Sequence, residues 1–135
     1  MKFFSQPFLI KYSDTDQMGI VHHSNYLKYF ENARIAWLRH LGVSYKKIEE
    51  DGILMPVVSA SIEFIIPLYF DDEITIEITL TELPKATLSF EYKIKNQINQ
   101  LVCRGKTKLA FLNSKTMKPL RVPKKIYDLF SDEFM

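Results

Sequence analysis

The residues with the greatest capacity for chemistry gather in the stretch YSDTDQMGIVHHSNY, residues 12–26. Two carboxylates, Asp14 and Asp16, precede a glycine, two adjacent histidines and a serine, although the chain contains only three histidines and four glycines. A carboxylate close to free backbone N–H groups suits acyl transfer, because the N–H groups stabilise the negative oxygen that forms during the reaction. The stretch therefore indicates a reaction site.

The residues that follow predict where those N–H groups come from. Residues 24–41 are the best helix candidate, with Ser24 as the N-cap and Gly42 in the left-handed position after the last turn. The first turn of a helix carries unpaired N–H groups that attract negative charge or a polarised carbonyl oxygen. Gly19 permits a close backbone approach in the preceding loop. We therefore expect the site at the start of this helix.

Each polar residue of the stretch also has a structural explanation. Asp14 suits a turn or cap, since aspartate hydrogen-bonds its own backbone two residues on, and this explanation is weaker for Asp16. His23 either orients the substrate or Asp16, with its N–H facing the site, or packs at the loop–helix junction. Metal ligation by His22 and His23 is disfavoured, because adjacent histidines diverge and His40 is remote. We expect neither a metal nor a cofactor.

Two other reactive side chains have plainer explanations. Glu31 lies in a polar stripe with Lys28, three residues before Arg34, where an intrahelical ion pair is expected. Cys103 belongs to an alternating strand whose apolar residues point inward, so we expect a buried and unreactive thiol. It is the only cysteine, which excludes an intramolecular disulfide and CxxC redox chemistry.

The elements that must hold the site predict an α+β domain over residues 1–135. The helix is apolar around most of its circumference, so other structure must surround it. Period-2 alternation predicts antiparallel strands after it, and a first strand precedes it despite Pro7. The predicted strands are 2–11, 58–66, 74–80, 87–94 and 101–111, and the predicted short helices are 44–52 and 122–130. The expected fold is one curved five-stranded sheet wrapped around one long helix.

Composition and charge exclude several classes of protein. With 135 residues, 47% of them hydrophobic, the chain suits one globular domain. Its net charge of +2 is too small to indicate non-specific nucleic-acid binding. No segment approaches the ~20 apolar residues of a membrane span, and no signal-peptide core is present, so we expect a cytoplasmic protein. One helix cannot cover five strands, and sheet edges need pairing, so we expect a homodimer.

The stretch YSDTDQMGIVHHSNYLKYFENAR, residues 12–34, resembles the signature of the 4-hydroxybenzoyl-CoA thioesterase family of hotdog-fold enzymes, which includes acyl-CoA thioesterases associated with the Tol-Pal system. The residues that fall on the pattern are Asp14, Asp16, Gly19, His23, Asn25, Tyr26 and Arg34. PLYFDDEI, residues 67–74, is similar to the next block of the family. His22 departs from the pattern, which often has an aromatic residue there, so the shape of the acyl pocket stays open.

The resemblance implies a thioester hydrolase that acts on acyl-CoA without metal, at a site shared between two protomers of a homodimer or homotetramer. Asp16 would be the catalytic carboxylate, as nucleophile or general base, and the N–H near His23 would bind the thioester oxygen. Gly19 and Tyr26 would line the substrate site. Lys85 and Arg121 fall where the family places contacts to the CoA phosphates, with plain surface charge as the alternative.

Other functions stay open on the sequence alone. An acyl-carrier-protein thioester or an aromatic thioester such as dihydroxynaphthoyl-CoA would suit the same architecture. Asp16 and His23 could also serve a hydratase. A non-catalytic acyl-thioester binding module is disfavoured, because a pure binder has no evident use for the Asp16 carboxylate beside an electron-rich thioester.

Overall fold

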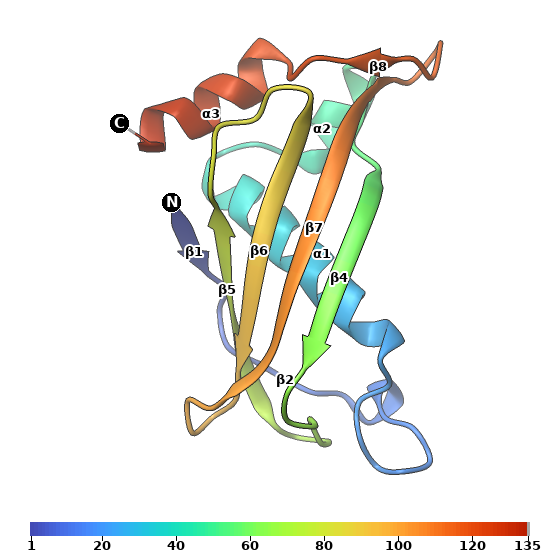
Figure 1. Ribbon diagram of the computed structural model, residues 1–135, viewed down its shortest axis with the longest axis vertical. Coiled ribbons are helices and arrows are strands. Elements are labelled where there is room, and N and C mark those ends of the chain that lie inside the picture. Colours follow the sequence, from blue (N-terminus) through green and yellow to red (C-terminus); the bar gives the residue numbers. More distant parts are fainter. Residues whose placement is uncertain (135) are drawn as a thin grey trace.

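A long helix lies across one face of a curved antiparallel sheet (Figure 1). The structure is a computed structural model that describes residues 1–134; residue 135, the last of the predicted domain, lies outside the described residues. The main elements are β1 (Lys2–Phe4), α1 (Ser24–His40), β4 (Val57–Phe64), β5 (Glu73–Leu80), β6 (Thr87–Lys95) and β7 (Leu101–Asn113). The main strands follow the order β1-β5-β6-β7-β4. The predicted α+β hotdog architecture is confirmed.

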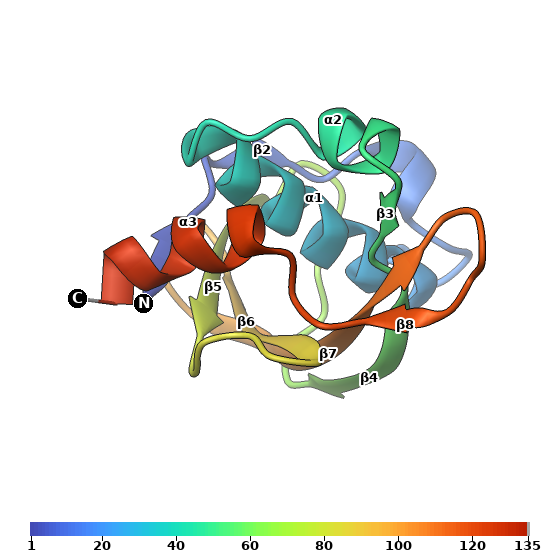
Figure 2. The same ribbon diagram turned by 90° about the horizontal axis from the view of Figure 1, so that it is seen from above.

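Short elements extend this framework at both edges. They are β2 (Phe8–Leu9), η1 (Tyr12–Asp14), α2 (Tyr45–Glu50), β3 (Ile53–Leu54), β8 (Pro119–Leu120) and α3 (Lys124–Phe134). β2 pairs with β5, whereas β3 and β8 pair with the far end of β7, so the sheet has eight strands in all. Seen from above, the sheet curls around α1 (Figure 2), and the side view shows α2 and α3 at the same, upper end of the molecule (Figure 1).

The prediction of one continuous strand over residues 2–11 was wrong. This segment is divided into β1 and β2, because Pro7 lies between them and cannot donate a backbone hydrogen bond. Phe4 faces Glu77 and Phe8 faces Ile74, so four steps along one strand oppose three along β5. One residue therefore bulges out, which is the local geometry expected at a sheet edge.

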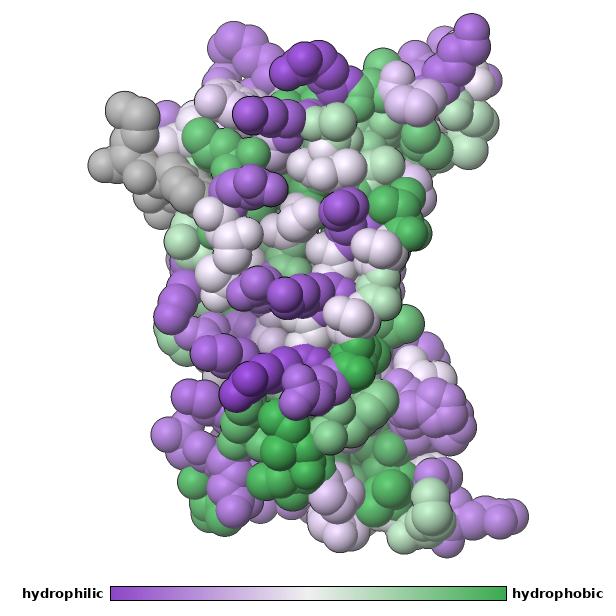
Figure 3. All heavy atoms as spheres, in the orientation of Figure 1, coloured by the Kyte–Doolittle hydropathy of each residue, from purple (hydrophilic) through white to green (hydrophobic). Residues whose placement is uncertain are grey.

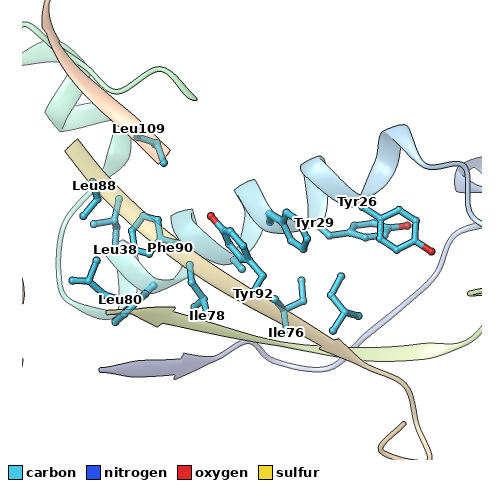
Figure 4. Close-up of a cluster of buried hydrophobic side chains, with 14 of the residues drawn as sticks. Tyr26, Tyr29, Leu38, Ile76, Ile78, Leu80, Leu88, Phe90, Tyr92 and Leu109 are labelled. Carbon is cyan, nitrogen blue, oxygen red and sulfur yellow. The ribbon is translucent and has the colours of Figure 1, made fainter. Parts of the chain in front are cut away.

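The core is formed where the inward residues of β5, β6 and β7 meet α1 (Figure 4). Phe30 of α1 is fully buried and stacks on Tyr92 of β6, with ring centroids 4.2 Å apart. Beneath this pair, a Cβ added to Gly105 of β7 would lie 2.3 Å from the Phe30 ring. Only glycine lets the helix approach the sheet this closely, so Gly105 sets the height of α1 above the sheet.

Arg34 overturns one prediction about α1. It is 8% exposed and donates a hydrogen bond of 3.0 Å to the Tyr92 hydroxyl, which lies 2.6 Å from Thr107 Oγ1. Among the described residues, neither Glu31 nor Arg34 has an ion-pair partner within 4.0 Å, so the expected intrahelical pair is wrong. The guanidinium instead faces the sheet, where burial raises the pKa of Tyr92 although Arg34 acts in the opposite direction.

β4 is an edge strand that is exposed along most of its length. The predicted strand 58–66 ends at Phe64, and a register shift between Val57 and Ser59 takes Val58 out of the alternation. Val58 and Phe64 are 56% and 54% exposed. One backbone edge of β4 pairs with β7, and the other faces no strand among residues 1–134. Such an edge is a surface for pairing with another chain.

The outer face of the sheet, opposite α1, is polar. Bands of hydrophilic side chains cross it (Figure 3). Two ion pairs lie there, Lys106 with Glu91 at 3.7 Å and Lys2 with Glu77 at 3.1 Å. The Lys106–Glu91 pair is exposed on both sides, and exposed pairs of this kind contribute little to stability. None of the helices in residues 1–134 has the length and apolarity needed to cross a membrane.

Candidate active site

The loop before α1 holds Asp16 in a fixed orientation. The N–H of Asp16 donates to the Ile20 carbonyl at 2.9 Å, and the N–H of Gly19 donates to the Asp16 carbonyl at 3.0 Å. Gly19 has φ +80°, a conformation that strains residues with a side chain. Asp16 Oδ1 accepts from the Met18 N–H at 2.8 Å, and Oδ2 accepts from no residue that the structure describes. One carboxylate oxygen is therefore anchored and the other is available.

Asp14 has the structural role that its turn position suggested. Its Oδ2 accepts a hydrogen bond of 2.9 Å from the hydroxyl of Tyr29 on α1. Its carbonyl accepts from the His22 N–H and from Asn25 Nδ2, both at 2.9 Å. Burial, followed by the hydrogen bond to Asp14, raises the pKa of Tyr29 above its usual range. Asp14 thus fastens the loop to the helix, whereas Asp16 keeps one carboxylate oxygen free among the described residues.

The start of α1 differs from the prediction in one detail. The helix begins at Ser24 with His23 at the N-cap position, and the His23 side chain makes no capping bond. His22 Nδ1 instead accepts from the Ser24 N–H at 3.2 Å and lies 2.8 Å from Ser24 Oγ. Ser24 as a side-chain N-cap is therefore wrong, because His22 supplies the acceptor. Gly42 is confirmed in the left-handed region, with φ +87°.

The backbone N–H of His23 is the free donor of this turn. The N–H groups of Asn25 and Tyr26 donate to the carbonyls of His22 and His23 at 3.0 and 3.3 Å. Within the described part of the chain, the His23 N–H has no such acceptor. A free N–H at the positive end of a 17-residue helix is suited to binding an oxyanion.

Asp16, His23 and Tyr26 line a single cavity of about 360 Å³. The other lining residues are apolar: Met18, Ile20, Val21, Phe64, Ile65, Ile66 and Pro67. The far wall is thus the end of β4 and the segment after it, about fifty positions from Asp16 in sequence. The structure therefore brings the predicted catalytic pair together with Tyr26, and Gly19 lies in the adjoining loop.

Lys85 and Arg121 lie away from this cavity. Lys85 is exposed in the β5–β6 turn, and its carbonyl accepts a 2.6 Å hydrogen bond from the N–H of Val122, the neighbour of Arg121. This turn is at the opposite end of the molecule from the start of α1 (Figure 1). The 17 residues of α1 span about 26 Å. Within one protomer, the two basic residues do not reach Asp16.

Among the described residues, no three His, Cys, Asp or Glu side chains form a group that could hold a metal ion. Cys103 is fully buried, and burial raises the pKa of its thiol to about 12. A neutral thiol is a poor nucleophile, in agreement with its predicted place in the core.

A carboxylate and a helix N-terminal donor on one apolar cavity have the chemistry needed to hydrolyse an acyl ester or thioester. The sequence matches the thioesterase-like superfamily over residues 10–130, and the chain belongs to that family. It is similar to a putative esterase of Aquifex aeolicus, with 33% identity over 123 residues, which cover 91% of this chain and 94% of that protein.

Two further proteins are similar to this chain, one in sequence and one in fold. The acyl-CoA thioesterase YbgC of Haemophilus influenzae is 30% identical over 128 residues, covering 94% of this chain and 93% of that protein. The solved DHNA-CoA thioesterase of Staphylococcus aureus, at 24% identity, shows the same fold with a TM-score of 0.92, covering 98% of this chain and 91% of that one. The family resemblance is confirmed, and so is the predicted enzyme class, a thioester hydrolase.

Proposed function

We propose that this chain hydrolyses acyl-CoA thioesters, with Asp16 as the catalytic carboxylate and the His23 N–H as the oxyanion donor. The observation that carries the proposal is that Asp16, whose Oδ2 is free, lines the same apolar cavity as His23, whose backbone N–H is free. The similar protein named acyl-CoA thioesterase YbgC supports CoA as the carrier. We also propose that the enzyme acts in the cytoplasm, where acyl-CoA is made and used.

The geometry suggests how the reaction proceeds. The thioester carbonyl oxygen would accept the His23 N–H, and the helix N-terminus would stabilise the charge that grows on this oxygen. Asp16 Oδ2 either attacks the carbonyl carbon, forming a mixed anhydride that water then cleaves, or removes a proton from an attacking water. In both routes the C–S bond breaks, the CoA thiolate takes up a proton, and the acid is released.

A second protomer would complete the site. We propose a homodimer in which the free edges of two β4 strands pair antiparallel across a twofold axis. Antiparallel pairing reverses the partner, so its Lys85 end comes beside the Asp16 end of the first protomer. The partner's Lys85 and the partner's Arg121 would then approach the CoA phosphates, which agrees with their distance from Asp16 within one chain. Further assembly of dimers into tetramers is compatible with this arrangement.

The decisive test measures free thiol released from short-chain, long-chain and aromatic acyl-CoA esters. Asp16→Asn should lower kcat/KM by roughly 10²- to 10⁴-fold, because it removes the charged carboxylate. Asp132→Asn, an exposed aspartate on α3, is the matched control and should keep the parent rate. Equal rates for the parent and a folded Asp16→Asn variant would refute the proposal.

The same assay tests the carrier and the partner residues. Turnover of an acyl-carrier-protein thioester, with none of any acyl-CoA, would make the carrier protein the substrate. If the partner's basic residues hold the phosphates, the double variant Lys85→Ala/Arg121→Ala should raise KM and leave kcat nearly unchanged. An unchanged KM would show that both residues are plain surface charge.

A further inference from the structure

Tyr26 is a buried tyrosine whose hydroxyl has no hydrogen-bond partner among the described residues. Its side chain is 3% exposed, and its ring packs edge-on against Phe64, with centroids 4.9 Å apart. In the described part of the chain, every side-chain oxygen or nitrogen that is fully shielded from solvent has a hydrogen-bond partner. The Tyr26 hydroxyl has no partner there, so it is accessible to solvent. Because Tyr26 lines the 360 Å³ cavity, we place its oxygen at the cavity wall.

Two other buried tyrosines show the contrast. Tyr29 donates to Asp14 at 2.9 Å, and the Tyr92 hydroxyl bonds with Thr107 and Arg34. The hydroxyls of Tyr26 and Tyr29 both point along α1 toward its N-terminal end (Figure 4). Buried hydroxyls are nearly always paired in folded proteins. The open hydroxyl of Tyr26 is therefore suited to a ligand atom.

The Tyr26 hydroxyl acts as a donor at physiological pH. Burial, with a smaller contribution from the nearby Cys103, raises the pKa of Tyr26 to about 12, so the proton stays on the oxygen. The rest of the wall is apolar apart from Asp16 and His23. A purely alkyl acyl group would displace water from the hydroxyl and offer nothing in return. An oxygen on the acyl group would replace the lost water.

The position of Tyr26 limits where that oxygen must be. Tyr26 follows His23 by three residues, so the two lie one turn apart on the same side of the helix, about 5–6 Å between Cβ atoms. The thioester carbonyl at the His23 N–H is thus close to the Tyr26 ring. An oxygen within a few bonds of the carbonyl, such as a hydroxyl on C3 of the acyl chain, meets this requirement.

We propose that Tyr26 determines the acyl specificity by donating a hydrogen bond to an oxygen near the thioester carbonyl. The inference rests on the proposed function and adds the class of acyl group that the site prefers. A site built to bond a substrate hydroxyl rejects the analogue that lacks it more strongly than a hydrophobic pocket rejects an added hydroxyl. Oxygenated acyl groups are therefore preferred over their alkyl counterparts.

The experiment compares matched esters, 3-hydroxybutyryl-CoA with butyryl-CoA and 3-hydroxyoctanoyl-CoA with octanoyl-CoA. In the parent, kcat/KM for the hydroxylated ester should exceed that of its partner by about tenfold or more in at least one pair. Tyr26→Phe keeps the ring and should bring the ratio close to one by slowing only the hydroxylated ester. Tyr45→Phe, a half-buried tyrosine of α2 outside the cavity, should keep the parent ratio.

Binding provides a second measurement that does not need turnover. In Asp16→Asn, the hydroxylated ester of each pair should bind more tightly than its alkyl partner. In Asp16→Asn/Tyr26→Phe, the two dissociation constants should be nearly equal. A parent ratio near one, or equal losses for both esters in Tyr26→Phe, would overturn the role of Tyr26 while hydrolysis itself stands. Absence of both hydrolysis and binding of every ester would overturn the proposed function and this inference together.

Discussion

Two polar clusters adjoin α1, one beside its first turn and one beside its middle. In the middle, the Tyr92 hydroxyl hydrogen-bonds with both Arg34 and Thr107 inside the core. At the first turn, the Oδ2 of Asp16 and the N–H of His23 have no partner within the described chain, and a cavity adjoins them. Buried polar groups that pair internally stabilise a structure, whereas unpaired groups beside a cavity are available to a substrate.

This difference separates stability from activity along a single helix. Changes at the first turn should alter the reaction and leave the free energy of unfolding nearly unchanged. Changes at the middle should lower the free energy of unfolding and leave the chemistry of the folded enzyme intact. Four substitutions or conditions can break or sharpen the contrast.

The largest effect is expected for Asp16→Asn, with roughly 10²- to 10⁴-fold lower kcat. Asparagine keeps an Oδ1 that can accept the Met18 N–H, so the loop should hold its shape. The free energy of unfolding, measured with urea, should therefore stay within about 0.5 kcal/mol of the parent value. Steady-state thiol release and equilibrium unfolding measure the two quantities. A strongly destabilised Asp16→Asn would mean that the carboxylate is structural and would remove the contrast.

The second effect concerns the contact beneath the middle cluster. A Cβ at position 105 would lie 2.3 Å from the Phe30 ring, so Gly105→Ala must displace Phe30 or α1. We expect a loss of about 1–3 kcal/mol in the free energy of unfolding, as for other overpacked cores. Ala110→Gly, which also changes one methyl group on β7, is the matched control. Gly52→Ala is unsuitable as a control, because Gly52 has a positive φ that strains any side chain. Unaltered stability of Gly105→Ala would show that the helix has room to move.

The two clusters also differ in how far the sequence predicts them. Asp16, Gly19 and His23 lie within eight residues, so local spacing and the family signature predict them as candidate site residues without knowledge of the fold. The opposite wall of the cavity escaped prediction, because Phe64 reaches it only through the pairing of β4 with β7. No local signal in the sequence points to that contact.

Arg34 shows the limit of local rules more clearly. Helical spacing favoured an ion pair with Glu31, but the partner of Arg34 is Tyr92, which is 58 residues away. Strand alternation correctly placed Tyr92 inward, yet it could not show which helical residue would meet it. His22 was likewise missed as the acceptor at the start of α1, since its role depends on the turn that brings Nδ1 to the Ser24 N–H. Tertiary packing decides both cases.

The third effect tests the middle cluster directly. Tyr92→Phe removes the hydroxyl that bonds with Arg34 and Thr107, leaving a buried guanidinium with fewer partners. The expected loss is about 1–3 kcal/mol in the free energy of unfolding, with kcat/KM of the folded enzyme unchanged. Thermal or urea unfolding, with thiol release below the transition, measures both. If Tyr92→Phe lowered kcat/KM tenfold at full stability, the middle cluster would belong to the site.

The smallest effect appears only at alkaline pH. Burial raises the pKa of Tyr26 and of Cys103 to about 12 in the folded state, above the ordinary values of 10.0 and 9.0. The unfolded chain therefore loses these protons first as pH rises, so the contribution of these two groups to stability is constant below about pH 9 and falls between about pH 9 and 12. Urea midpoints at pH 8 and pH 10.5 should show the fall.

Single substitutions then show whether Tyr26, beside the first-turn cluster, or Tyr92, in the middle cluster, contributes more to this fall in stability. Tyr26→Phe should flatten the pH dependence more than Tyr92→Phe, because Arg34 and Thr107 oppose the effect of burial at Tyr92, whereas Cys103 adds to it at Tyr26. If instead Tyr92→Phe flattened it more, the phenol paired with Arg34 would carry the larger shift. The closed hydrogen bonds of the middle cluster would then fail to favour the charged form of Tyr92, contrary to the contrast drawn between the two clusters.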